Sequence, residues 1–324
     1  MPFENLKVSI LIPVYNRENI IFETLKSAAS QTHINTEIII VDNKSIDNTF
    51  KILQKFAEHN SNVKVYQNNT NIGPVLNWRK CLEYSTGDYI KILWSDDLIA
   101  PSFIENTLPY LVNNKNIGFV FTGTELFSDI SKEKIKAYFI GNTGIYNTSD
   151  FIRNSLLNSY YPVSPGNALF RRKDIKVNLL TDIPNRIGSD FKMHAIGNDI
   201  LIYLLTAISY SKFAFINESL SFFRIHPDSI TISSNSTDKE LLYYMAKAYF
   251  TENYLNNRTL KKMFNKKLAF YFLNHRDNSL CIKSARDFFA NPDNFQMDFI
   301  DKLKLKLRTA RINIKRCLKN INPL

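Results

Sequence analysis

The sequence predicts an α/β fold in which a mostly parallel sheet is flanked by helices and followed by a helical, basic C-terminal extension. Two observations predict it. Runs of β-branched residues alternate with helix-like segments in the first part of the chain, and such alternation is typical of right-handed βαβ units. The formal net charge of +11 lies entirely in residues 241–324, which hold 17 Lys/Arg and 6 Asp/Glu, whereas residues 1–240 hold 24 of each.

The first half of the chain predicts three βαβ units in a row. Its four apolar, β-branched runs are expected to be strands, at residues 7–12, 37–41, 63–66 and 89–93. The segments between them are expected to be helices, at residues 18–31, 46–59 and 72–84. Pro13 is expected to close the first strand, and a further helix is expected near Pro101.

The pattern is looser from about residue 117 to residue 225. Strands are expected at residues 117–121 and 213–216, with a helix at 196–209. The polar stretch 233–238 looks like a linker. We therefore divide the chain into an α/β domain, residues 1–232, which is expected to carry the function, and a helical basic region, residues 233–324.

Several function classes lose support from composition. Cys81, Cys281 and Cys317 are far apart, which indicates a reducing, cytoplasmic setting without a disulfide framework. No signal-peptide pattern or run of about 18 apolar residues is present. The basic charge belongs to an appendage rather than to a binding face, so we expect no nucleic-acid partner. The sequence also lacks the glycine-rich loops of dinucleotide-binding and P-loop proteins.

Polar loops follow three of the expected strands, at residues 13–17, 42–45 and 94–97. Parallel α/β sheets bind ligands beyond the carboxyl ends of their strands, so these loops are expected to share one edge. The last loop ends on Asp96 and Asp97. Two adjacent carboxylates at a strand end repel each other, and a shared divalent cation relieves the repulsion. The alternative is that one of them caps the helix near Pro101.

Three stretches together resemble glycosyltransferase family 2, the inverting nucleotide-sugar enzymes of the GT-A fold. They are residues 9–17 (SILIPVYNR), residues 40–49 (IVDNKSIDNT), and residues 71–73 (NIG) leading into 87–97 (GDYIKILWSDD). The resemblance covers about residues 6–232. It implies transfer of a sugar, in the manner of a hexosyltransferase, from a nucleoside diphosphate sugar to a hydroxyl of a glycan or lipid-linked acceptor. UDP-sugar is the expected donor, Mn²⁺ or Mg²⁺ the expected cofactor, and bacterial surface polysaccharide synthesis the expected setting.

The resemblance also implies which residues contact the nucleotide sugar. They are Pro13, Val14, Tyr15, Asn16, Asp42, Asn71, Gly73, Asp96 and Asn167. In the family, residues matching 13–16 lie beneath the nucleotide base, and the acid matching Asp42 accepts a hydrogen bond from the base. Asp42 could instead be a turn or cap residue, and Asn71 and Gly73 could form an ordinary loop.

The metal site implied by the resemblance consists of Asp96, Asp97 and His226. The family commonly shows Asp-Ser-Asp-Asp where this chain has Trp94-Ser95-Asp96-Asp97, so Trp94 takes the place of the first acid. That change puts the number of metal ligands in doubt. His226 could also be an ordinary loop histidine.

Asp199 matches the family's catalytic base, which must reach the acceptor hydroxyl opposite the leaving diphosphate. Asn198 stands where family members often carry Glu. Asp199 could also be the N-cap of the following helix, and the two roles are compatible.

The end of the chain predicts a basic amphipathic helix over about residues 300–321. Such helices lie on anionic membrane surfaces, so we expect a peripheral position on the inner face of a membrane. Two alternatives stay open. The strict alternation of residues 302–308 is typical of an edge strand, and Leu305 and Ile312 fall outside the helical row of apolar residues. Alternatively, the helix could pack on a partner or on the enzyme core.

Two other function classes remain. A nucleotidyltransferase also uses an α/β sheet, acids and a metal, but residues 13–17 lack its glycine-rich triphosphate loop. The changes at Trp94 and Asn198 give some weight to a non-catalytic GT-A-like module that binds sugar nucleotide or scaffolds an assembly.

Overall fold

The computed structural model describes residues 3–129, 134–158, 160–226, 236–276 and 278–321. The chain divides into two compact units, residues 1–183 with 190–234, and residues 184–189 with 235–324. The assignment of catalysis to the first unit and an accessory role to the second stays a prediction.

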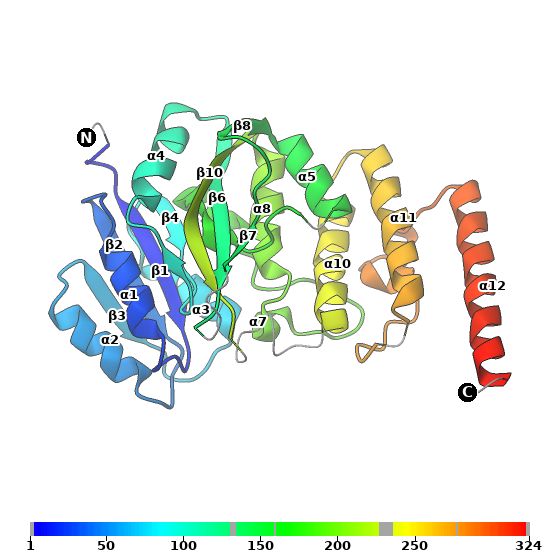
Figure 1. Ribbon diagram of the computed structural model, residues 1–324, viewed down its shortest axis with the longest axis horizontal. Helices are drawn as coiled ribbons and strands as arrows, with labels where there is room; N and C mark the ends of the chain where they lie inside the picture. The colour runs from blue at the N-terminus through cyan, green and yellow to red at the C-terminus, as the bar shows by residue number, and fades with distance from the viewer. Residues whose placement is uncertain (1–2, 130–133, 159, 227–235, 277, 322–324) are drawn as a thin grey trace. The chain divides into compact units, whose positions relative to one another are not determined.

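The first unit is built on a ten-stranded sheet with strand order β3-β2-β1-β4-β9-β6-β10-β5 (Figure 1). Its first half is parallel, as expected, and consists of β1 (Val8–Val14), β2 (Thr36–Asp42), β3 (Val63–Gln67) and β4 (Tyr89–Ile92). Strand β9 (Ala168–Arg171) then runs antiparallel between β4 and β6 (Ile117–Phe127).

The second half of the sheet is mixed. Strand β10 (Lys212–Arg224) is parallel to β6 and antiparallel to β5 (Leu98–Ile99) and β8 (Gly144–Asn147). Strand β7 (Ile135–Ala137) pairs antiparallel with β6. The α/β class with flanking helices is therefore confirmed, while the parallel pairing is concentrated in the βαβ half that the sequence pattern marks.

The helices of this unit cover the sheet. They are α1 (Ile21–Ala29), α2 (Thr49–Glu58), α3 (Pro74–Tyr84), α4 (Phe103–Asn113), α5 (Thr148–Leu157), α6 (Arg172–Asn178), α7 (Phe191–His194) and α8 (Asn198–Ser209). Helix α3 begins at Pro74, at the first helical position that proline favours, rather than at Ile72. Helix α4 has Ser102 as its N-cap, so the interpretation of Asp96 or Asp97 as its cap was wrong.

Pro13 lies inside β1, although it was expected to end the strand. The strand continues to Val14 because only one neighbour is present there. Pro13 is in register with Val41 of β2, whereas the pairing with β4 stops at Leu11 and Ile92. The missing N–H of proline therefore removes no ladder hydrogen bond on the β4 side.

Apolar residues of the parallel strands form a core with α1 and α4, including Ile10, Ile12, Leu25 and Phe103. Helix α8 is buried along most of its length, from Asn198 to Ala207. The carboxyl ends of the strands and the start of α8 therefore both adjoin well-packed core.

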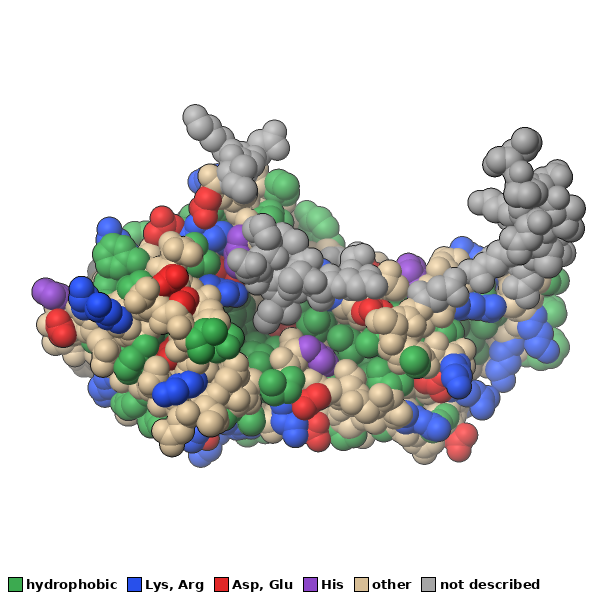
Figure 2. All heavy atoms as spheres, turned by 90° about the horizontal axis from the view of Figure 1, so that it is seen from below, with side chains coloured by type: hydrophobic (Ala, Val, Ile, Leu, Met, Phe, Trp, Pro, Cys, Tyr) green, Lys and Arg blue, Asp and Glu red, His purple; other side chains and the backbone are tan. Residues whose placement is uncertain are grey.

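The C-terminal unit is helical, as expected. Its helices are α10 (Ser236–Asn253), α11 (Arg258–Asn274) and α12 (Phe299–Ile321). The edge-strand alternative for residues 302–308 was wrong, since they lie within α12. Figure 2 shows Lys/Arg and apolar side chains together at the right-hand end, where α12 lies in Figure 1. Among the described residues, no helix combines the length and apolar character needed to cross a bilayer.

Candidate active site

The loops after β1 and β2 are joined by side-chain hydrogen bonds. The backbone N–H of Asn16 donates to Ser45 Oγ (2.8 Å), and Asn16 Oδ1 accepts from the N–H of Ile46 (3.0 Å). Asn16 adopts the left-handed conformation, with φ of 50°, that asparagine tolerates better than most residues. Tyr15 beside it is 38% exposed. The two expected nucleotide-binding loops thus form one surface.

Asp42 is fully buried at the end of β2. Its carboxylate accepts hydrogen bonds from Ser45 N (3.0 Å), Ser45 Oγ and Gln67 Nε2 (2.8 Å). Asp42 therefore shapes the turn before α2, as its alternative role required, while its contact with a nucleotide base stays a prediction.

Asn71 and Gly73 are fastened to the same edge through Asn43, which the sequence reasoning did not single out. Asn43 Nδ2 donates to Asn71 Oδ1 (2.8 Å), and the N–H of Gly73 donates to the same oxygen (2.9 Å). Gly73 has φ of +83°, and a Cβ there would lie 2.6 Å from Met193 Sδ. Glycine is required here by the backbone and by the packing of α7.

The acid pair faces two basic residues from distant parts of the chain. His226 Nε2 lies 2.9 Å from Asp96 Oδ2, and an Arg17 guanidinium nitrogen lies 4.0 Å from the same oxygen. The Nε of Arg17 is buried without a hydrogen-bond partner. Asp96, His226 and the first loop are therefore brought together, as the metal prediction required.

Asp97 differs from Asp96 in its surroundings. It is buried, and its Oδ1 accepts a hydrogen bond from the N–H of Arg224 (3.0 Å). Burial raises the pKa of the Asp97 carboxyl well above its usual range, and the charge of Asp96 raises it further. The Arg224 guanidinium in turn pairs with Glu23 and Asp129, so the residue that donates to Asp97 is itself held in place.

This arrangement fits a divalent cation with few protein ligands. Asp96 and His226 supply an oxygen and a nitrogen within 2.9 Å of each other, and imidazole suits Mn²⁺ better than Mg²⁺. In the part of the chain that the structure describes, no cluster of three His, Cys, Asp or Glu side chains is poised around a metal position. Cations held by one or two carboxylates usually complete their shell with substrate phosphates and water.

Lys91 of β4 is fully buried, and the sequence reasoning did not identify it. Its ammonium group donates to Gly166 O and lies 4.3 Å from the centre of the Phe103 ring. Burial lowers the pKa of Lys91 to about 7, although the charge of Asp97 opposes this. A lysine within an otherwise apolar strand was the signal available in the sequence.

Asp199 lies in the first turn of α8, whose N-cap is Gly197, so Asp199 is not the capping residue. It is 8% exposed, and its Oδ1 accepts from the N–H groups of Gly197 (3.0 Å) and Ile200 (2.8 Å). The neighbouring Asn198 is buried and donates to Leu180 O (2.9 Å). The side chain that replaces the family's Glu thus serves packing.

Tyr138 lies within electrostatic reach of both Asp199 and Asp97, and no sequence pattern pointed to it. Burial raises the pKa of Tyr138 to about 12, and the charges of Asp199 and then Asp97 add to this effect. Its φ of 63° is rare for an aromatic residue, and such strain is common at functional sites. The neighbouring Phe139 packs over Gly123, where its ring fills the space that a Cβ would occupy.

Trp94 and Asn167 both serve packing around a short turn, Pro165–Asn167. Trp94 Nε1 donates to Ser164 Oγ (2.7 Å), and its ring lies 4.6 Å from that of Trp78. The amide of Asn167 is fully buried and bonded to Thr122 O (3.1 Å) and to the hydroxyl of Tyr203 (2.6 Å). A ligand contact by Asn167 stays a prediction.

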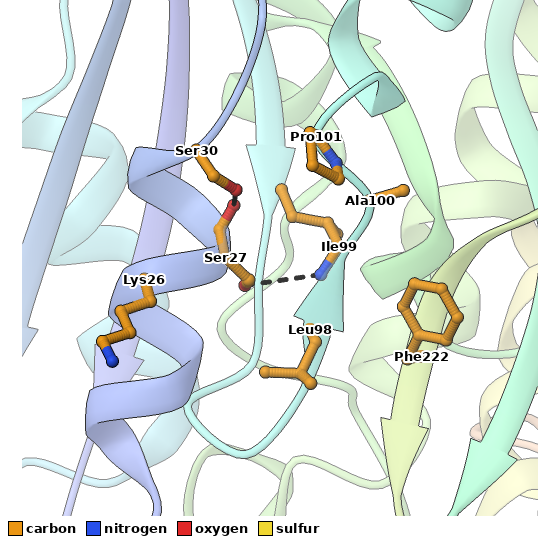
Figure 3. A pocket seen from close by; sticks show the side chains of 8 residues that line it. All are labelled: Lys26, Ser27, Ser30, Leu98, Ile99, Ala100, Pro101 and Phe222. Atoms are coloured by element: carbon orange, nitrogen blue, oxygen red, sulfur yellow. Dashed lines mark hydrogen bonds between the residues drawn. The ribbon is translucent and has the colours of Figure 1, made fainter.

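A shallow apolar groove of about 420 Å³ lies beside this site, between α1 and the β5–β10 pair (Figure 3). Leu98, Ile99 and Phe222 line one side, and Lys26 and Ser27 the other. The groove holds no acid, so it offers no general base for a reaction.

Solved structures share this architecture. The crystal structure of S. aureus TarS 1–349 in complex with UDP-GlcNAc matches 84% of this chain and 74% of its own, with a TM-score of 0.62 and 18% identity. At that identity the likeness shows the fold, which is GT-A. The fold is therefore of the GT-A class, and the acid-bearing loop lies at the carboxyl end of its parallel strand β4.

A sequence model of "Glycosyl transferase family 2" matches residues 9–178, and the chain belongs to this family. "Putative glycosyltransferase EpsE" of Bacillus subtilis (strain 168) is 35% identical over 124 residues, 38% of this chain and 45% of its own length. "UDP-Glc:alpha-D-GlcNAc-diphosphoundecaprenol beta-1,3-glucosyltransferase WfgD" of Escherichia coli is 33% identical over 125 residues, 38% of this chain and 48% of its own length. The chain thus spans about half the length of these curated relatives.

Proposed function

We propose that the protein is an inverting, metal-dependent glycosyltransferase that moves a sugar from a nucleoside diphosphate sugar to a hydroxyl of a glycan or lipid-linked acceptor. The observation that carries this proposal is the pairing of Asp96 with His226, 2.9 Å apart, at the carboxyl end of β4. Residues separated by 130 positions are held together there without forming part of the apolar core.

The chain's own side chains suit a direct displacement. Asp199 would accept the proton of the attacking hydroxyl, and the Tyr138 side chain lies within the electrostatic reach of this carboxylate. Arg17 brings a positive charge next to Asp96, where the diphosphate would leave. A single displacement inverts the anomeric centre and needs no covalent nucleophile.

A divalent cation, Mn²⁺ or Mg²⁺, would be held by Asp96 and His226 and would stabilise the charge on the departing diphosphate. Asp97, whose backbone-bonded carboxylate is turned to Arg224, would support the loop rather than take a full share of the coordination.

The donor and acceptor are proposed by analogy. WfgD is named for a UDP-glucose donor and a diphosphoundecaprenol-linked acceptor, and a further relative is named for teichuronic acid biosynthesis. TarS was crystallised with UDP-GlcNAc. These names support a UDP-sugar donor and surface-polysaccharide synthesis. We further propose a cytoplasmic position on the inner face of a membrane.

The second candidate is a non-catalytic module that binds sugar nucleotide. The packing roles of Trp94 and Asn198, which occupy positions where the family often has acids, favour it. It predicts nucleotide binding without turnover.

A panel of nucleoside diphosphate sugars with Mn²⁺ or Mg²⁺, scored by nucleoside diphosphate release, tests the proposal. We expect Asp96→Ala to abolish metal-dependent release while the protein stays folded. Asp88→Ala is the matched control, because this exposed acid lies at the other end of β4. Full activity in Asp96→Ala would show that Asp96 is not the residue that holds the metal.

A further inference from the structure

The amphipathic surface of α12 is the clearest feature that the transfer reaction leaves unused. Four large apolar side chains at its start are exposed to solvent: Phe299 (81%), Ile300 (64%), Leu303 (49%) and Leu307 (57%). Isolated exposed apolar residues are ordinary, but a run of them on one helix indicates a binding surface. We call these four residues the apolar stripe.

The opposite face of α12 already has a partner within the same unit. Asp301 pairs with Lys266 of α11 (2.6 Å), and Thr309 accepts a hydrogen bond from Arg276 (3.4 Å). Leu305, which falls off the apolar stripe, is half-buried between these two positions. At about 100° per residue, positions 301, 305 and 309 lie nearly opposite 300, 303 and 307. The helix is therefore anchored by one face and leaves its apolar stripe open.

Basic residues flank the apolar stripe on both sides. On the helical projection Lys302 and Lys306 fall on one side of it and Lys304 on the other. Over its whole length α12 carries eight Lys/Arg and one acid, Asp301, and that acid is paired with Lys266. Lys302, Lys304 and Lys306 are exposed, and the helix carries no matching set of acids.

We propose that α12 binds an anionic lipid surface through the apolar stripe, with its lysines at the level of the lipid phosphates. Charge complementarity selects this occupant: a partner protein would need a groove lined by acids, whereas an anionic bilayer offers negative charge above an apolar layer along the full helix. The apolar stripe would then be the site of the peripheral attachment proposed above, and testing it needs neither donor nor acceptor.

The test is flotation of the full chain with vesicles of phosphatidylglycerol and, separately, of phosphatidylcholine. The expected result is binding to phosphatidylglycerol that weakens at least tenfold when salt is raised to about 0.5 M, with little binding to phosphatidylcholine. Equal binding to both lipids, or binding to neither, would overturn the proposal.

Two variants locate the surface. Leu303→Ser with Leu307→Ser should weaken vesicle binding about tenfold or more. The matched control, Ile34→Ser with Val177→Ser, removes exposed apolar side chains (80% and 71%) from the first unit and should bind as the wild type does. Lys302→Glu with Lys306→Glu should lose the preference for phosphatidylglycerol.

Nucleoside diphosphate binding in solution, measured on the same variants, should not change. That readout separates a failed membrane surface from a failed glycosyltransferase assignment. If the stripe variants instead convert a dimer to a monomer at unchanged vesicle binding, the apolar stripe joins two copies of the chain and the lipid proposal is wrong.

Discussion

Glu37 anchors the four parallel strands at the end remote from the candidate active site, and its neutralisation should destabilise the first unit. The carboxylate lies on β2 and accepts hydrogen bonds from Ser9 Oγ of β1 (2.6 Å) and Thr86 N just before β4 (2.6 Å). Lys7 (2.8 Å) and Lys64 of β3 (3.7 Å) pair with it. One side chain therefore connects all four strands whose other ends carry the site.

The size of the effect follows from the pKa of Glu37. Burial would raise it, but the hydrogen bonds from Lys7, Ser9 and Thr86 lower it from 4.5 to about 2. At about 1.4 kcal/mol per pKa unit this gap corresponds to about 3 kcal/mol. Because Lys7 and Lys64 are 36% and 48% exposed, solvent screening reduces the expected contribution to about 2 kcal/mol.

The pH dependence has a definite sign. A carboxyl whose pKa is lowered by folding stabilises the folded state above about pH 4.5, and this stabilisation is lost as the pH falls toward 2. Glu37→Gln should therefore cost about 2 kcal/mol at pH 7, with the difference from the wild type closing between pH 4.5 and 2.

Urea unfolding followed by tryptophan fluorescence is the suitable assay. Trp78 and Trp94 are the chain's two tryptophans, and both lie in the first unit, so the signal reports on that unit alone. Glu58→Gln, at an exposed acid on α2, is the control. Equal stability of Glu37→Gln and the wild type at pH 7, or a gap that persists to pH 2.5, would refute the reasoning.

Three further substitutions test the site. Gly73→Ala should lose about 1–2 kcal/mol in urea unfolding and weaken nucleotide binding, because of the φ of +83° and the 2.6 Å approach of Met193; unchanged stability would contradict this. Tyr138→Phe keeps the ring but removes the hydroxyl near Asp199, and kcat should fall about tenfold with the donor KM unchanged; an unaltered kcat would exclude this role. Trp94→Asp restores the family's acid but removes the ring that packs on Trp78, so the free energy of unfolding should fall by about 2–4 kcal/mol. We expect no tighter Mn²⁺ binding, and tighter binding measured by calorimetry would contradict this.

The sequence allowed the βαβ half and the position of the acid-bearing edge to be predicted, because both depend on local patterns. Strand and helix periodicities locate β1 to β4 within a residue or two. Helix starts were less accurate, since the side chains of Asp42, Asp47 and their neighbours bend the chain before α2 begins at Thr49. The antiparallel insertion of β9 depends on long-range pairing that no local pattern encodes.

The contacts that assemble the site could be predicted only in part, because they also join residues far apart in the sequence. The pairing of Asp96 with His226 was suggested by the family resemblance, and the structure supplies the contact. Lys91 lies on β4 and Tyr138 directly follows β7, so the electrostatic influence of Asp97 on both side chains could be found only from coordinates. The buried Lys91 could have been suspected from its apolar flanks alone.

Turnover by Asp199→Asn tests the central claim most directly. The wild type, Asp199→Asn and the control Asp182→Asn, at an exposed acid, would be compared with Mn²⁺, the preferred UDP-sugar and an acceptor, with nucleotide affinity measured alongside. A catalytic base predicts that Asp199→Asn binds UDP normally and loses about 10²- to 10⁴-fold in kcat, while Asp182→Asn keeps it. If all three proteins bound the sugar nucleotide and none transferred or hydrolysed it, the protein would be a binding module and not an enzyme.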